Sequence, residues 1–390
     1  MRWRTVKLDS VKAHVPYAFV GGPFGSNLTT RDYAEEGVPV IRGNNLPSHN
    51  SFYDDGFVFV SEKKADDLRP NAAQPGDIIF TQRGTLGQVG FIPRDARFPR
   101  YIISQSQMKL TVDTETADPR FIYYFFRMPM TVQKIVNHAL TSGVPHINLG
   151  ILKDFEITLP DLDVQRRISS SLSTYDDLIE NNRRRIALLE EAASQLYREW
   201  FVRLQFPGHE HSRNNAGVPE GWEQKNLGEM LTLKRGYDLP ESRRAEGDIP
   251  IVSSSGITGF HNEKKAVAPG IVTGRYGTIG EVFFLQQDYW PLNTALYVSD
   301  FKGNPPAFLA QLLKHALGGT LSDKAAVPGV NRNVLHRLTV LSPQKRLIDQ
   351  FAEFAHLTYQ QIHALETTNQ RLRAARDLLL PRLMSGEIAV

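Results

Sequence analysis

The hydrophobic pattern of the chain follows the same order twice. Short apolar runs separated by Gly, Pro and Asn come first, as is typical of β-strands joined by tight turns. A short helical stretch follows, Pro119–Met128 in the first half and Pro306–Leu317 in the second. Each half then has a further strand ending in Pro and a long helical pattern. The strand-like runs are 37–43, 56–60 and 76–81 in the first half, and 248–256, 270–277 and 294–298 in the second.

Apolar residues in the two long helical patterns recur every seven positions, which is the spacing of a coiled-coil seam. We predict helix packing by Ile186, Leu189, Ala193, Leu196 and Trp200, following Ile179, in the first pattern. In the second pattern we predict it for Leu365, Leu372 and Leu379, with Phe351, Phe354, Leu357 and Ile362 extending the apolar face. Pro381 should end or kink this helix. Each stripe could lie on the core of its own domain, but the matched positions favour an antiparallel pair of helices between the halves.

Motifs shared by the halves indicate a diverged internal duplication. The turn G-T-L-G-Q-V at Gly84 returns as G-T-I-G-E-V at Gly277, 193 positions later. Further on, V-P-H-I-N at Val144 is echoed by V-P-G-V-N at Val327, and Q-R-R-I at Gln165 is echoed by Q-K-R-L at Gln344.

Composition narrows the class of protein. The chain has 390 residues, of which 41% are hydrophobic and 22% charged, as in ordinary globular proteins. It has no cysteine, which excludes disulfides and thiolate zinc sites and favours a cytoplasmic protein. No apolar run approaches the ~20 residues of a membrane helix, so we expect no membrane contact. The net charge of +3 is a weak indication of an anionic partner.

The repeated glycine turn does not match a nucleotide-binding loop. A Walker loop requires a Lys that neither copy has, and a dinucleotide fingerprint requires a different glycine spacing before a helix. We interpret the turn as a tight β-hairpin whose glycines supply positive φ.

Two other stretches resemble catalytic or metal-binding motifs. Asn304–Phe308 resembles the N-P-P-aromatic motif of amino-methyltransferases, but Ala307 stands where a stacking ring is needed. We expect a loop before a helix there. Gly208–His211 contains two His and one Glu, but it lies in a polar Gly/Pro-rich stretch that is typical of a linker, and we predict no metal site.

Four stretches together resemble the specificity subunit of type I restriction–modification systems. They are Gly21–Leu46, Pro75–Pro93, Ile157–Val202 and Leu380–Ile388, in the order that this family has them. The second half departs more from the family pattern, notably at Lys234–Arg244.

The resemblance implies an α+β fold. Two mixed α/β target-recognition domains, related by internal duplication, would be joined by two long antiparallel coiled-coil helices. The expected segments are a first recognition domain at 1–160, a central spacer helix at 161–205, a second recognition domain at 206–343 and a distal helix at 344–390.

The resemblance also implies a function without catalysis. Each domain would read one half of a bipartite, asymmetric site in double-stranded DNA, and the helices would fix the spacing between the halves. Two modification subunits, which bind S-adenosylmethionine and methylate adenine N6, would dock on the chain. Restriction subunits driven by ATP, with Mg²⁺, would join them, so this chain would itself need no cofactor.

Basic and polar side chains in loops are the candidates for DNA contacts. Each could instead be an ordinary solvated charge. In the first half they are Arg31, Arg42, Asn44, Asn45, Arg83, Arg94, Arg97 and Arg100. In the second half they are Lys234, Arg235, Tyr237, Arg243, Arg244, Lys264, Lys265 and Arg275.

Two other classes stay open. The chain could be a self-sufficient methyltransferase or nuclease with appended recognition domains, or a coiled-coil scaffold that never reads DNA.

Overall fold

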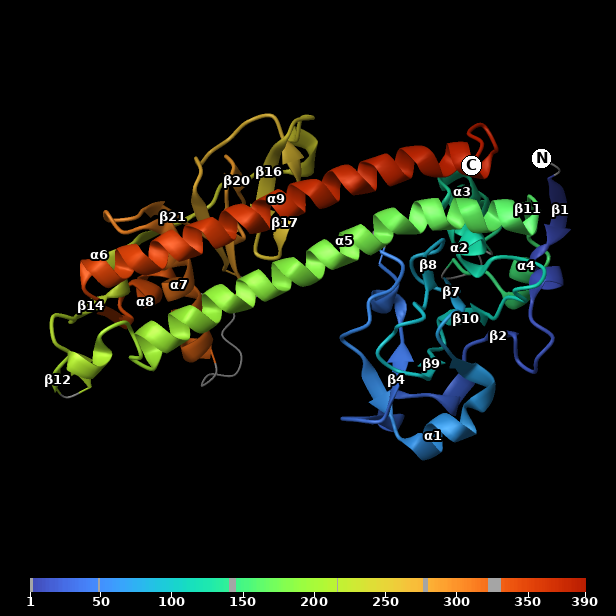
Figure 1. Ribbon diagram of the computed structural model, residues 1–390, viewed down its shortest axis with the longest axis horizontal. Coiled ribbons are helices and arrows are strands. Elements are labelled where there is room, and N and C mark those ends of the chain that lie inside the picture. The colour runs from blue at the N-terminus through green and yellow to red at the C-terminus, as the bar shows by residue number, and fades with distance from the viewer. Residues whose placement is uncertain (1–2, 48–49, 140–144, 216, 276–279, 322–330) are drawn as a thin grey trace. The chain divides into compact units, whose positions relative to one another are not determined.

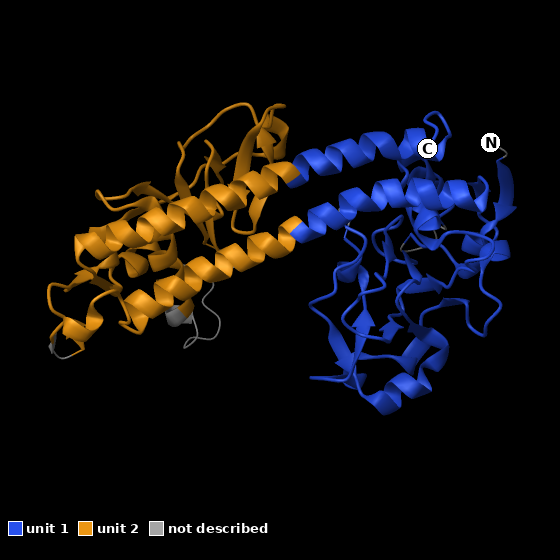
Figure 2. Cartoon of the chain, in the orientation of Figure 1, with its two compact units in different colours: residues 1–181, 369–390 blue, residues 182–368 orange. Residues whose placement is uncertain are grey.

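The computed structural model describes residues 3–47, 50–139, 145–215, 217–275, 280–321 and 331–390 (Figure 1). The chain forms two compact units (Figure 2). Unit 1 consists of Met1–Asn181 with Asn369–Val390, and unit 2 consists of Asn182–Thr368. Each unit therefore combines a β-rich body with part of both long helices.

Unit 1 is built around a four-stranded antiparallel sheet with the order β2-β10-β7-β8. A second sheet has the order β3-β5-β4-β9-β6, in which β4 and β9 are parallel, and β1 pairs with β11. The strands are β1 (Arg4–Lys7), β2 (Phe19–Gly21), β3 (Tyr33–Ala34), β4 (Val38–Ile41), β5 (Val58–Val60), β6 (Ala72–Ala73), β7 (Ile78–Thr81), β8 (Val89–Phe91), β9 (Tyr101–Ile103), β10 (Gln107–Leu110) and β11 (Glu156–Leu159). The helices are α1 (Glu62–Asp67), α2 (Pro119–Arg127), α3 (Pro129–Asn137), α4 (Leu149–Lys153) and the first part of α5 (Leu162–Tyr197).

Unit 2 repeats this plan. Its four-stranded sheet has the order β15-β21-β18-β19, its second sheet has the order β17-β16-β20 with β16 and β20 parallel, and β14 pairs with β22. The strands are β12 (Asn214–Asn215), β13 (Val218–Pro219), β14 (Glu223–Asn226), β15 (Thr232–Arg235), β16 (Ile249–Ser253), β17 (Gly256–His261), β18 (Gly270–Gly274), β19 (Val282–Leu285), β20 (Trp290–Pro291), β21 (Ala295–Asp300) and β22 (Thr339–Ser342). The helices are α6 (Leu227–Met230), α7 (Pro306–Leu321), α8 (Arg332–His336), the last part of α5 and the first part of α9 (Lys345–Met384).

The matching strand orders confirm the predicted duplication and the α+β fold class. The repeated asparagines now have a structural reason. Asn148 accepts a hydrogen bond from the Ile151 backbone at the start of α4, and Asn331 accepts one from the Asn333 backbone at the start of α8. Both are N-caps, a position that favours asparagine. The echoed residues Val144 and Val327 lie outside the described residues.

The predicted hairpin is confirmed for the first glycine turn, but the turn is not tight. Strands β7 and β8 pair directly, and residues 82–88 connect them. Gly84 and Gly87 have φ of 95° and 84°, in the left-handed region that glycine adopts without strain. In unit 2, β18 and β19 form the equivalent pair, but Tyr276–Ile279 of the second copy lie outside the described residues.

One glycine in each unit is required by a close backbone approach. A Cβ added to Gly22, just after β2, would lie 2.0 Å from the Ser104 carbonyl oxygen. A Cβ added to Gly236, just after β15, would lie 2.2 Å from the Leu292 carbonyl oxygen. Ser104 and Leu292 each follow the strand that is parallel to β4 or β16, so the two contacts are equivalent. The duplication has therefore preserved a backbone contact that no other residue type fits.

The long helices form as predicted, but they differ from the prediction in how they end and in how far the apolar face extends. Helix α5 runs into a π-helical segment at Arg198–Val202. Helix α9 continues past Pro381 to Met384, so the proline does not end the helix: it lacks one N–H donor, but its fixed φ is compatible with the helix. Phe354 and Leu357 do not extend the apolar face, since they are 41% and 55% exposed. Among the predicted packing residues Ala193 is buried, whereas Ile186, Leu189, Leu196, Trp200, Leu365, Leu372 and Leu379 are half-buried.

Within each unit the two helices run antiparallel. In unit 1 the buried Asn369 of α9 donates to the carbonyl of Ile179 in α5. In unit 2 the Tyr197 ring of α5 packs edge-on against Phe351 of α9, with ring centroids 5.7 Å apart. The helices complete the core of both units, because Leu172 and Leu380 join the core of unit 1, and Tyr197 and Phe351 join that of unit 2. Burying one such side chain contributes about 1.5–3 kcal/mol.

These units divide the chain differently from the four expected segments. Each long helix is shared, since unit 1 ends at Asn181 in α5 and resumes at Asn369 in α9. The spacer and distal helices are thus also parts of the two cores.

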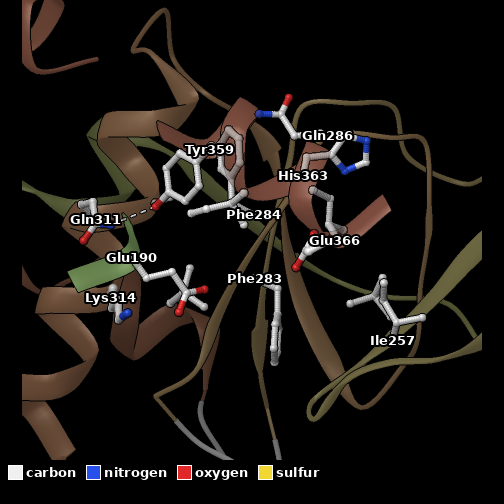
Figure 3. Close-up of a pocket in the computed structure, with 15 residues that line it drawn as sticks. Glu190, Ile257, Phe283, Phe284, Gln286, Gln311, Lys314, Tyr359, His363 and Glu366 are labelled. Atoms are coloured by element: carbon white, nitrogen blue, oxygen red, sulfur yellow. Dashed lines mark hydrogen bonds between the residues drawn. The ribbon is translucent and has the colours of Figure 1, made fainter. Parts of the chain in front are cut away.

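A cavity of about 150 Å³ lies in unit 2 where both helices face β19 and α7 (Figure 3). Glu190 of α5 and Glu366 of α9 line it, together with Tyr359, which stacks on Phe284 at 4.2 Å and accepts a hydrogen bond from Gln311. Burial raises the pKa of both glutamates, and the charge of Glu190 raises the pKa of Glu366 further. Lys314 and His363 also line the cavity, and the charge of Lys314 lowers the pKa of Glu190.

Alanine at the two equivalent glycines should destabilise the chain. G22A and G236A each force a Cβ into a carbonyl oxygen, and we expect a loss of about 1–3 kcal/mol in the free energy of unfolding. Urea unfolding followed by circular dichroism measures this loss. G318A is the matched control, because Gly318 lies in α7 with open space around it, and this change should stabilise the chain by up to ~1 kcal/mol. Equal effects at all three glycines would contradict the close approach.

Replacing Glu366 by Gln should raise Tm at pH 7. A raised pKa in the folded chain means that stability is lost as pH rises above the ordinary value of 4.5, so a neutral amide removes that loss. The side chain is partly open to solvent, so we expect a gain of only about 1–3 °C at pH 7. The gain should vanish near pH 4. E353Q, at an exposed site of the same helix, should leave Tm unchanged at both pH values.

Candidate nucleic-acid interface

Unit 2 brings three of the predicted residues together in one basic and aromatic cluster. Lys234 of β15 lies 5.8 Å from the ring centroid of Tyr237, which follows that strand. Lys265 lies 4.8 Å from the ring centroid of Trp290 in β20, and the rings of Tyr237 and Trp290 are 6.4 Å apart. Two ammonium groups thus flank adjacent aromatic rings, an arrangement suited to phosphates and base faces.

The electrostatics of Tyr237 reflect this cluster. Its hydroxyl is 3.1 Å from that of Tyr297 in β21. The hydrogen bond with Tyr297, followed by the charges of Lys234 and Lys265, lowers the pKa of Tyr237. Burial, followed by the same hydrogen bond, raises the pKa of Tyr297. The Tyr237 hydroxyl therefore lies beside one other hydroxyl and within the field of two ammonium groups.

The other candidates of unit 2 have different surroundings. Arg235 donates to the carbonyl of Asn293, and Lys264 forms a salt bridge of 2.6 Å with Asp288. Arg243 is exposed in the 3₁₀ turn after Pro240. The Nε of Arg244 is buried without a hydrogen-bond partner among the described residues, and Arg275 is half-buried.

The prediction that Asn45 of unit 1 contacts DNA is wrong. Its side chain is fully buried, accepts a hydrogen bond from the Arg42 backbone and donates to the carbonyls of Tyr53 and Asp55. It holds the loop after β4 in place. Its neighbour Asn44 is exposed on the same loop, and Arg42 donates to the Gly56 carbonyl from a half-buried position.

The remaining candidates of unit 1 lie in separate loops. Arg31 is exposed in a 3₁₀ turn, and Arg83 is exposed in the hairpin connection. Arg97 lies over the Phe98 ring at 5.2 Å. Arg100 bonds both Glu62 and Asp66 of α1, so a phosphate would have to compete with two carboxylates for it. All of these remain predictions as DNA contacts.

A basic cleft in unit 1 includes two arginines that the sequence patterns missed. Arg94 follows β8, Arg120 lies in α2 and Arg166 lies at the start of α5, and all three line a cleft of about 760 Å³. Five hydroxyl side chains also line it: Thr111, Thr114, Ser169, Ser170 and Ser173.

Both carboxylates that line this cleft are engaged within the protein. Asp77 accepts from Thr111 and pairs with Lys109, and Asp118 caps α2 by accepting from the Phe121 backbone. The arginines therefore leave the cleft basic, which suits phosphate oxygens, although the hydroxyls of Thr111, Ser169 and Ser173 donate within the protein. No local motif links Arg120 to Arg166, 46 positions apart, so only the fold could bring them together.

The two stretches that resemble a methyltransferase motif and a metal-binding site are parts of ordinary loops and turns. The Asn304 amide donates to the carbonyls of Met230 and Phe301, and Pro306 begins α7, as expected for a loop before a helix. His209–His211 form one 3₁₀ turn. Throughout the described residues, no group of three His, Cys, Asp or Glu side chains is arranged to hold a metal ion. No helix in that same part of the chain is both long and apolar enough to cross a membrane.

Comparison with solved structures supports the fold. The crystal structure of the type I restriction–modification system S subunit from M. genitalium aligns with 98% of this chain and 96% of its own, with a TM-score of 0.59 and 17% identity. At this identity the likeness concerns the fold alone.

Comparison with known sequences identifies the family. The chain is 22% identical to the type I restriction enzyme MjaIX specificity subunit of Methanocaldococcus jannaschii, over 95% of this chain and 91% of that protein. It is 20% identical to the HindI specificity subunit of Haemophilus influenzae, over 81% of this chain and 87% of that protein. The model of the type I restriction modification DNA specificity domain matches residues 26–191 and 219–346, more than half of the chain. The chain therefore belongs to the family of type I restriction–modification DNA specificity proteins.

Proposed function

We propose that this chain is the specificity subunit of a type I restriction–modification enzyme and that it reads a bipartite, asymmetric site in double-stranded DNA. The observation that carries the proposal is the duplicated plan of units 1 and 2, combined with different side chains in the reading positions. Two bodies with the same fold offer two reading surfaces, and their different loops select different half-sites.

The side chains of the two units differ most clearly at structurally equivalent positions. The turn after β15 presents Tyr237 and follows Lys234, whereas the turn after β2 has Pro23 and follows Val20. A basic and aromatic cluster therefore characterises unit 2, whereas unit 1 has its arginines in the cleft around Arg120 and on separate loops. Half-sites of different sequence are the expected consequence.

Helices α5 and α9 are proposed to set the spacing between the half-sites. Both helices contribute to both units, so the lengths of the helices would limit how far apart the two half-sites lie. A helix rises by about 1.5 Å per residue and B-DNA by about 3.4 Å per base pair. One heptad in each helix therefore corresponds to about three base pairs.

Catalysis is assigned to the partners of this chain. We propose that two modification subunits supply S-adenosylmethionine-dependent methylation of adenine N6, and that restriction subunits supply ATP-driven, Mg²⁺-dependent cleavage. Asn304, in the stretch that resembles a methyltransferase motif, is occupied by backbone hydrogen bonds, which supports a non-catalytic chain. Binding of labelled S-adenosylmethionine by the purified chain alone would favour the self-sufficient alternative instead.

Replacing Arg243 and Arg244 together by Ala should weaken DNA binding and flatten its dependence on salt. Each lost phosphate contact reduces the slope of log K against log salt by about one. Fluorescence anisotropy with duplex DNA at several salt concentrations measures the slope. K345A/R346A is the matched control, because it removes two adjacent exposed charges at the start of α9. An unchanged slope in R243A/R244A would remove these arginines from the interface.

Inserting one heptad into each helix should lengthen the spacer of the recognised site by about three base pairs. The insertions belong between Asn181 and Asn182 and between Thr368 and Asn369, where the units meet along the chain. Seven residues rotate the helix by only ~20°, so the packing faces are kept. Methylome sequencing of a host that carries the complete system reads the spacer directly. The same spacer in the doubly inserted variant would refute the spacing role.

A further inference from the structure

The helix pair of unit 1 contains a buried ion pair. Arg376 of α9 donates to Asp176 of α5, and their side chains are only 2% and 12% exposed. The Tyr124 hydroxyl of α2 also donates to Asp176, at 2.6 Å, and Arg376 donates to Asp377 at 2.9 Å. Both charges are thus neutralised by specific partners, which is the condition for keeping them away from water.

The duplication gives each residue of α5 a counterpart in α9. The repeated motifs at Gln165 and Gln344 place the counterpart 179 positions later. The core supports this correspondence, since the fully buried Leu172 of α5 then matches the fully buried Phe351 of α9. Because the two helices are homologous and antiparallel, each could in principle pair with the same helix of a second chain.

The ion pair has an uncharged counterpart in unit 2. Asp176 corresponds to Ala355, and Arg376 corresponds to Tyr197. Ala355 and Tyr197 are 0% and 4% exposed and lie in one apolar core with Phe351. Burial alone raises the pKa of Tyr197, which agrees with an apolar environment. The contact between α5 and α9 is therefore an ion pair in unit 1 and an apolar contact at the equivalent positions of unit 2.

This difference distinguishes correct pairing from self-pairing. In the α5–α9 pair, Asp176 meets Arg376, while Tyr197 and Ala355 share an apolar core. In an α5–α5 pair between two chains, Asp176 would face the second copy's Tyr197. In an α9–α9 pair, Arg376 would face the second copy's Ala355. Each self-pair therefore loses the Asp176–Arg376 ion pair at both ends, leaving Asp176 with only the Tyr124 hydroxyl and Arg376 with only the exposed Asp377 carboxylate, which is unfavourable for buried charges.

We propose that Asp176 and Arg376 determine the pairing of the duplicated helices, selecting α5 with α9 within one chain and rejecting exchange between chains. A single buried polar position is known to select partner and register in helix pairs, because wrong partners leave it unsatisfied. This inference concerns assembly of the chain itself and is independent of DNA recognition.

An exchange assay on the full chain tests this role. Two preparations with different N-terminal tags are mixed, unfolded in guanidinium and refolded together. One tag is captured, and the amount of the other tag that is captured with it is measured. D176A/R376Y gives unit 1 the residues that unit 2 has, so it remains packed but no longer penalises self-pairing. We expect at least tenfold more co-capture for this variant than for the wild type, together with a dimer mass in light scattering.

R376K is the matched control, because it keeps a positive charge opposite Asp176 and should exchange as little as the wild type. If D176A/R376Y does not refold, D176L/R376M, which is also apolar at both positions, takes its place with the same expectation. The proposal is overturned if a refolded apolar variant with wild-type helical content exchanges no more than the wild type. It is also overturned if R376K exchanges as much as the apolar variant.

Discussion

The antiparallel contact between α5 and α9 inside each unit is the constraint on which the rest of the structure depends. Neither β-rich body closes its core alone, since Leu172 and Leu380 complete one core and Tyr197 and Phe351 complete the other. The helices are therefore structural parts of the recognition units as well as the connection between them. A change in helix pairing would alter both reading surfaces together.

Much of the architecture could be predicted because its causes are local or repetitive. Heptad spacing from Ile179 to Trp200 predicted α5, and the matched motifs at Gln165 and Gln344 predicted the duplication. Asn148 and Asn331 were recognisable as repeated residues, and their capping role follows from ordinary helix chemistry. Such features depend on a few neighbouring residues, which a sequence displays directly.

The candidate interface was less predictable because burial and proximity arise from distant segments. Asn45 has the same side chain as Asn44, but only the Asn45 amide is buried and donates to the carbonyls of Tyr53 and Asp55. Phe354 and Leu357 fit an apolar stripe although the fold leaves them exposed. The arginines of the basic cleft come from three separate elements, and Asp176 meets Arg376 across 200 positions. None of these relations has a local pattern.

The interrupted course of unit 1 has a consequence for the order of events during protein synthesis. Its core includes Leu380, Leu383 and Met384, whereas unit 2 is continuous from Asn182 to Thr368. As the ribosome extends the chain, all of unit 2 emerges before unit 1 receives these residues. The first unit to be translated is thus the last to be completed, and its apolar sheet face and the Asp176 carboxylate stay uncovered until α9 arrives. A cell that makes this protein must keep a half-finished domain from aggregating while the other half of the chain is still being made.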